Sequence, residues 1–83
     1  MIFYNIAMTL FDARAGARLR VVQILGGRGV RNRLFAMGLN PGDYIRIIQI
    51  APFRGTFFIE NLSNGSKFAL GRGIARKIIV EYA

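Results

Sequence analysis

Apolar and polar residues alternate along five short stretches of this 83-residue chain, a pattern typical of strands that bury one face. The five stretches are residues 18–25, 44–50, 56–62, 67–70 and 78–82. Residues that favour turns separate them, and Asn64-Gly65 is the pair most typical of a type I′ hairpin turn. Five short strands divided in this way predict an all-β fold, a small β-barrel.

In the first two stretches the alternation shifts by one position. The segments "LRVVQI" (19–24) and "IRIIQI" (45–50) match position by position, and each has two adjacent apolar residues at its centre. Because side chains on a strand point to alternate faces, such a shift moves all following side chains to the opposite face. We therefore expect a bulge or a strong bend in both strands, and six residues are too few to indicate an internal repeat.

Between these two strands, apolar residues recur at helical spacing. Val30, Leu34 and Met37 fall on one side of a helix, whereas Arg28 and Arg31 point away from that side. The pattern predicts one short α-helix between the first two strands of the barrel.

The end of this helix is specified residue by residue. Gly38 stands where a helix ends in a left-handed residue, and Leu39 stands where it packs back on Leu34, as in a Schellman motif. Pro41 then prevents the helix from resuming, and Gly42 permits the turn into the next strand. We expect this corner to dock the helix across a pair of strands and to close the barrel.

The side-chain inventory argues against catalysis. The chain has no His and no Cys, and its four carboxylates, Asp12, Asp43, Glu60 and Glu81, are scattered along the sequence. General acid-base catalysis normally needs a His or a close pair of carboxylates. The sequence therefore predicts a protein that is not an enzyme, with no catalytic residues, no metal ligands, no cofactor and no small-molecule substrate.

The start of the chain is read as an extension. Residues 1–7 are mostly apolar, and Met8 is a second possible start, so we divide the chain into an extension (1–7) and one domain (8–83). A strand formed by this extension at the barrel edge would promote a homo-oligomer. The apolar runs are too short for a membrane span, and the start lacks signal-peptide features, which predicts a cytoplasmic protein.

Positive charge changes the expected partners. Ten Arg and two Lys against four carboxylates give a net charge of +8, which attracts nucleic acid, anionic lipid or an acidic protein surface. Arginine binds carboxylates and phosphates through paired hydrogen bonds, so clustered arginines favour binding over a merely solvated surface, which stays the alternative. The candidate partner-binding residues are Arg28, Arg31, Arg33, Phe53, Arg54, Arg72, Arg76 and Lys77. Among the aromatic residues, Phe53 and Phe58 are expected to be exposed.

Three segments carry a resemblance to a known family. "TLFDARAGARLRVVQI", "RLFAMGLNPGDYIRI" and "GIARKIIVE" resemble the FeoA family, small proteins of bacterial and archaeal ferrous iron uptake, across nearly all of residues 9–81. The family hallmark is matched by Arg33, Leu34, Met37, Gly38, Leu39, Pro41 and Gly42. The closing pattern is matched by Ala75, Ile78 and Val80.

The resemblance implies an SH3-like barrel and a cytoplasmic accessory role beside FeoB, a membrane iron permease with a GTP-binding domain. It also implies weak transition-metal binding, for which this sequence offers only carboxylates, main-chain oxygens or an oligomer interface. Two hypotheses follow. The chain is an adaptor that docks on the cytoplasmic part of a ferrous iron transporter through its arginines, or it is a basic nucleic-acid-binding barrel related to the SH3-like domain of iron-dependent repressors.

Overall fold

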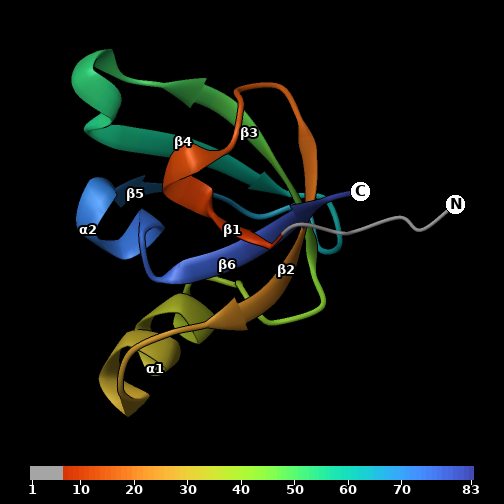
Figure 1. Cartoon of the computed structure of the whole chain (residues 1–83). Coiled ribbons are helices and arrows are strands. Elements are labelled where there is room, and N and C mark those ends of the chain that lie inside the picture. Colours follow the sequence, from red (N-terminus) through yellow and green to blue (C-terminus); the bar gives the residue numbers. More distant parts are fainter. Residues whose placement is uncertain (1–6) are drawn as a thin grey trace, which may run out of the picture.

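Six antiparallel strands form one sheet in the computed structural model, which describes residues 7–83. Along the sheet the strands follow the order β1-β6-β2-β3-β4-β5 (Figure 1). Their bounds are β1 (Met8–Thr9), β2 (Arg18–Ile24), β3 (Tyr44–Ile50), β4 (Thr56–Asn61), β5 (Lys67–Gly71) and β6 (Ile78–Tyr82). The sheet is open, because it ends at β1 on one side and at β5 on the other.

The predicted count of five strands is wrong, because β1 adds a sixth at the edge of the sheet. In β1 only Met8 and Thr9 are paired, with Val80 and Ile79 of β6, and two residues are too few to show an alternating pattern. The other five strands lie where the alternation predicted them. Residues 1–6 of the predicted extension, and with them the predicted strand pairing between copies, lie outside the described residues.

Four short helical segments interrupt the sheet. They are α1 (Arg28–Ala36), α2 (Arg72–Ala75) and the 3-10 turns η1 (Leu10–Asp12) and η2 (Pro52–Arg54). The predicted helix is α1, but it lies between the second and third strands, and α2 is a second helix where a tight turn was expected. No helix within residues 7–83 is long and apolar enough to cross a membrane.

Both predicted bends are confirmed. The pairing of β2 with β6 shifts between Val21 and Gln23, and the pairing of β3 with β4 shifts between Ile47 and Gln49. Val22 and Ile48 are the extra residues, and both are exposed at the surface. Each strand thus bends away from one partner, which lets the sheet curl around a single core.

The core is built from the inward faces of the strands and is covered by the helices. Its fully buried members include Leu19, Val21, Ile45, Ile47, Phe57, Ile59, Ile78 and Val80 of the strands. Leu34 of α1 and Leu39 just after it belong to the same cluster, and so does Ala75 of α2. Both helices are therefore held to the sheet by burial of apolar side chains.

The end of α1 has the predicted Schellman geometry. Gly38 has a φ of 93°, its N–H donates to the carbonyl of Phe35 over 2.9 Å, and the N–H of Leu39 donates to the carbonyl of Leu34 over 2.8 Å. These are the two hydrogen bonds of that motif. The chain therefore leaves α1 in a fixed direction and enters β3.

The hairpin between β4 and β5 is confirmed, but its type I′ turn is wrong. A type I′ turn needs positive φ at both central residues. Here φ is positive at Gly65 (79°) but not at Asn64. The N–H of Gly65 donates to the carbonyl of Asn61 over 2.7 Å, which closes a longer loop with Gly65 in the left-handed position.

Candidate functional site

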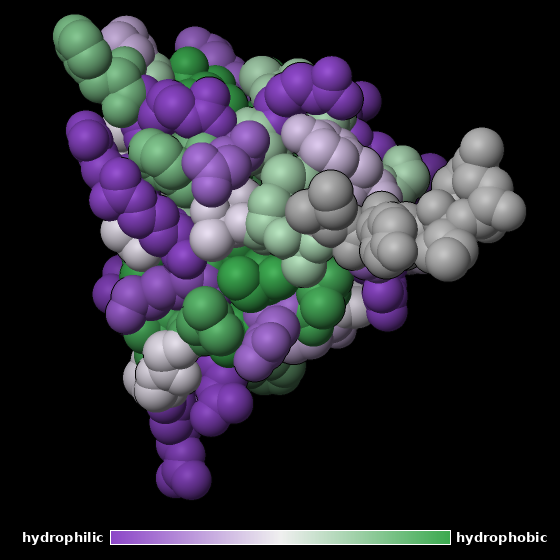
Figure 2. Space-filling view, viewed as in Figure 1, coloured by the Kyte–Doolittle hydropathy of each residue, from purple (hydrophilic) through white to green (hydrophobic). Residues whose placement is uncertain are grey.

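The candidate arginines gather on one side of the molecule, where α1, α2 and η2 lie (Figure 1). Figure 2, drawn from the same direction, shows hydrophilic side chains along much of that edge. We call this surface the basic edge. It consists of Arg28, Arg31 and Arg33 of α1, Arg72 of α2, and Arg76 and Lys77 just after α2.

Three local contacts make the basic edge continuous. The side chain of Lys77 lies against Gly26 at the start of α1, with its Cδ 3.6 Å from the position of a Cβ there. Arg33 lines the same pocket as residues of α2 and β5. At the other end, Nη2 of Arg72 lies 3.5 Å from the equivalent Cβ position of Gly55, directly after η2.

No carboxylate of the described residues forms an ion pair with a cation of the basic edge. Among residues 7–83, the ion pairs are Arg20 with Glu81 (3.1 Å) and Arg46 with Glu60 (2.8 Å), and both lie on the sheet. Asp43 is likewise occupied, since it accepts hydrogen bonds from the N–H of Asn40 and the side chain of Asn61. The charge of the edge is therefore free to act on a partner of opposite charge.

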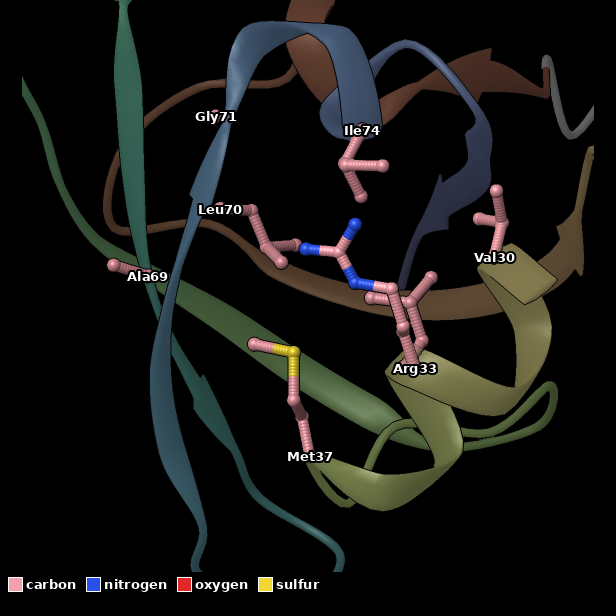
Figure 3. Close-up of a pocket in the computed structure, with 8 residues that line it drawn as sticks. Val30, Arg33, Met37, Ala69, Leu70, Gly71 and Ile74 are labelled. Atoms are coloured by element: carbon pink, nitrogen blue, oxygen red, sulfur yellow. The ribbon is translucent and has the colours of Figure 1, made fainter.

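A small pocket lies within the basic edge, between α1 and the free side of β5 (Figure 3). It encloses about 70 Å³ and is lined by Val30, Arg33, Leu34 and Met37 of α1, Ala69, Leu70 and Gly71 of β5, and Ile74 of α2. Figure 3 shows the guanidinium of Arg33 reaching across it toward Leu70 and Ile74. Small-molecule sites usually measure roughly 300–1,000 Å³, so this pocket suits a single apolar side chain.

Arg54 differs from the other candidates because its guanidinium points inward. Its Nε and Nη2 donate to the carbonyl oxygen of Phe11 over 3.0 and 2.5 Å, and Nη2 also donates to the carbonyl of Ala13 over 2.8 Å. The guanidinium also lies 5.5 Å from the ring centroids of both Phe11 and Phe57. These contacts fasten η2 to η1 and occupy the Nε and Nη2 donors of Arg54, which leaves fewer donors for a partner.

We expect Arg54→Ala to lower the free energy of unfolding by about 1–3 kcal/mol, because it removes charge-assisted hydrogen bonds and leaves partly buried carbonyls unpaired. Arg54→Lys should recover only part of this loss, since an ammonium cannot reproduce the fork of a guanidinium. Urea denaturation followed by circular dichroism measures the difference. Arg31→Ala on the exposed side of α1 is the control. Equal stability of the two alanine variants would contradict the conclusion that the hydrogen bonds of Arg54 hold η2 to η1.

The most exposed aromatic side chain of the described residues is Phe53, as predicted, with an exposed fraction of 91%. Its backbone is left-handed (φ 61°), and Arg54 follows with a φ of 53°. Phe35 of α1, which was not among the candidates, is also exposed, and so is Phe58. Phe11, in contrast, is half-buried, and the guanidinium of Arg76 lies 4.3 Å from its ring centroid.

Asn61 is the residue that sequence reasoning missed. It is fully buried, and its Nδ2 donates to the carbonyl of Gly38 over 2.7 Å and to Oδ2 of Asp43 over 2.9 Å. Its Oδ1 accepts from the N–H of Ser63 over 2.9 Å. One side chain thus ties the end of α1 to the start of β3 and to the β4–β5 loop. An Asn shortly before an Asn-Gly pair signals only a turn, so no pattern of neighbouring residues indicates this role.

Potential metal ligands do not cluster in the part of the chain that the structure describes. Within residues 7–83 no three His, Cys, Asp or Glu side chains lie close enough together to hold a metal ion. The described residues offer charge on the basic edge, the small pocket within it, a larger pocket lined by residues that include Ile48, Phe58 and Phe68, and the exposed ring of Phe53.

Known proteins resemble this chain over most of its length. The model of the FeoA domain matches residues 8–82. A relative from Methanocaldococcus jannaschii, named "Putative Fe(2+) transport protein A", is 38% identical over 71 residues, which cover 86% of this chain and 82% of the relative.

Solved structures give the same result. A crystal structure of an iron uptake regulatory protein (FeoA) is 33% identical, has a TM-score of 0.83, and covers 94% of this chain and 100% of its own. A manganese-dependent transcriptional repressor is 22% identical, with a TM-score of 0.85 over 93% of this chain and 37% of the repressor, which shows a shared fold only. The SH3-like fold implied by the resemblance is confirmed.

Proposed function

The chain belongs to the FeoA domain family, and on that premise we propose that it is a non-enzymatic, cytoplasmic accessory protein of ferrous iron uptake. In this role it docks on the cytoplasmic part of a FeoB-type, GTPase-coupled iron transporter and modulates transport. Fe²⁺ is the cargo of the transporter in this proposal, and the chain acts through protein contact.

The observation that carries the proposal is the basic edge with a small pocket inside it. Six cations on α1, on α2 and just after it have no carboxylate partner within residues 7–83. Charge of one sign steers an oppositely charged partner and fixes its orientation. The pocket adds a place for one apolar side chain, and Met37 in its wall adapts easily to different shapes. An acidic protein segment that carries one apolar residue fits both features.

The direct test is binding of the full chain to the purified cytoplasmic domain of such a transporter, by calorimetry at low and at moderate salt. We expect binding that weakens as salt rises, because exposed charges are screened over about 10 Å at 0.1 M salt. A folded chain that binds at neither salt concentration would refute the docking proposal.

The double variant Arg28→Ala/Arg31→Ala should weaken this binding by about fivefold to tenfold, since each exposed cation contributes up to roughly 1 kcal/mol. The matched control is Arg14→Ala/Arg18→Ala, which removes the same charge outside the basic edge, where these side chains lie over the rings of Tyr82 and Tyr44. Equal weakening by both double variants would show that net charge, and not the basic edge, determines binding.

Nucleic acid is the competing partner, because a positively charged surface attracts phosphates as well as carboxylates. The similarity to the repressor does not decide between the two partners, since it concerns the fold alone. Duplex DNA in the same buffers tests it. A nucleic-acid-binding barrel would show a logarithm of affinity that falls with log salt by roughly 0.9 per neutralised phosphate. DNA binding of this kind without transporter binding would replace the docking proposal.

A further inference from the structure

The η2 loop ends in an apolar tip. Phe53 has an exposed fraction of 91%, and Pro52 beside it is exposed as well. The loop joins β3 to β4 and projects from the sheet at the upper left of Figure 1. An aromatic side chain in this position gains nothing from the core of its own chain, because almost all of its surface faces solvent.

The tip is held in place by the rest of the structure. Phe53 and Arg54 both have positive φ, a backbone region that costs energy for residues other than glycine. Such a conformation persists only where the surroundings fix it. Here the hydrogen bonds of Arg54 to the carbonyls of Phe11 and Ala13 fix it. The contacts of Arg54 therefore hold the loop in the conformation that exposes Phe53.

Cations lie behind the tip. Arg72 approaches Gly55, which directly follows η2, and Arg76 lies over Phe11 of η1. Asp12 of η1 accepts a hydrogen bond from the hydroxyl of Thr9. From the tip inward, the order is therefore an apolar ring first and guanidinium groups second.

This order matches the surface of an anionic bilayer, in which phosphate groups lie outside and acyl chains lie deeper. Aromatic side chains favour the boundary between headgroups and acyl chains, and basic residues bind anionic headgroups. We propose that the η2 tip inserts Phe53 into this boundary, while Arg72 and Arg76 bind the phosphates. One aromatic residue with a few cations supports weak, reversible binding.

A single-stranded nucleic acid fits this tip less well. Base-stacking surfaces present several aromatic side chains along a groove. The next exposed phenylalanines of the described residues are Phe35 and Phe58, which lie on α1 and β4. The proposal shares Arg72 and Arg76 with the basic edge but is tested separately from transporter docking, because docking is tested on a soluble domain without lipid.

The test is co-flotation of the full chain with vesicles of phosphatidylcholine alone and of phosphatidylcholine mixed with phosphatidylglycerol. We expect binding to the mixed vesicles only. Phe53→Asn, which keeps a residue that tolerates positive φ, should weaken the partitioning about tenfold, as expected for loss of a buried phenylalanine. Arg72→Ala should weaken it about fivefold, as expected for one cation near an anionic surface.

Phe35→Ala is the matched control, since it removes another exposed phenylalanine from α1 and should leave partitioning unchanged. Equal weakening by Phe35→Ala and Phe53→Asn would overturn the proposal, and so would undiminished flotation of Phe53→Asn. Failure of the unaltered chain to bind the mixed vesicles would overturn it as well.

Fluorescence gives a second readout, because the chain contains no Trp. In Phe53→Trp the emission should shift to shorter wavelength when mixed vesicles are added and stay unchanged with phosphatidylcholine alone. No shift with mixed vesicles, or a change produced only by single-stranded DNA, would overturn insertion of the tip.

Discussion

Replacing Gly38 by alanine is expected to lower the free energy of unfolding by about 2–4 kcal/mol, because the left-handed backbone there is costly for any residue with a Cβ. The φ of 93° lies beyond the left-handed well that an alanine tolerates best. A Cβ would also lie 2.8 Å from Oγ of Ser66 and 3.3 Å from Nδ2 of Asn64. In a domain of this size the melting temperature should fall by roughly 10–20 °C.

Gly29→Ala is the matched control for Gly38→Ala. Gly29 lies inside α1, its φ is not positive, and no atom lies within 4 Å of its Cβ position. Alanine there should raise stability by about 0.5–1 kcal/mol, because it favours the helix over the unfolded chain. Thermal unfolding followed by circular dichroism compares the two. Similar melting temperatures for both variants would contradict the role assigned to Gly38.

Replacing Asn61 by aspartate is expected to destabilise the fold by about 3–5 kcal/mol at neutral pH, because it buries a charge without a partner. The amide Nδ2 that now donates to the carbonyl of Gly38 and to Oδ2 of Asp43 would become an acceptor facing two acceptors. The total stability of an 83-residue domain is roughly 4–12 kcal/mol, so this single change removes a large part of it.

The loss in Asn61→Asp should depend on pH. Burial beside Asp43 raises the pKa of the introduced carboxyl above its unfolded value of about 3.9. A raised pKa in the folded state means that the folded form is favoured below the unfolded pKa, and that this advantage is lost as pH rises through the folded pKa. The deficit relative to the unaltered chain should therefore shrink as pH falls.

Asn61→Leu separates charge from hydrogen bonding. It removes the same donors without adding a charge, so we expect a loss of about 2–3 kcal/mol that does not depend on the carboxyl. Urea denaturation of both variants over a range of pH measures the two effects. A deficit with the same pH dependence in both variants would show that the introduced carboxylate does not meet Asp43 as the structure places it.

The features that the sequence predicted correctly are those that a few neighbouring residues determine. Gly38 and Leu39 specify the end of α1 without reference to the rest of the chain, and their Schellman hydrogen bonds are present. The doubled apolar positions at Val22 and Ile48 likewise predicted where each strand bends. In both cases the local pattern has only one low-energy solution.

The features that the sequence did not predict depend on distant partners. The strand β1 exists because Met8 and Thr9 meet β6, about seventy residues later in the chain. The role of Asn61 depends on Gly38 and Asp43, which other elements bring to it. No local pattern distinguishes a buried Asn of this kind from an ordinary turn residue.

For the candidate surface, the sequence supplied candidate arginines, whose binding role is a proposal, but it did not predict the directions of their side chains. Arg33 reaches across the pocket beside α1, whereas Arg54 turns inward to main-chain carbonyls of η1 and the residue after it. The two residues have the same chemistry and differ only in what the fold places around them. The direction of a long side chain is decided by tertiary contacts, which a pattern of residue types does not contain.

The first and last strands of the described chain lie side by side, and the C-terminal end of β6 lies on the side opposite α1 and α2 (Figure 1). Met8 pairs with Val80, and the N–H of Ala83 donates to the carbonyl of Arg18 over 3.0 Å. A polypeptide can therefore enter and leave this unit at one place, which makes the unit portable between larger proteins. A purification tag or a sensor-chip linker attached at the C-terminal end would therefore lie on the side opposite α1 and α2, and it would leave the basic edge accessible to binding partners.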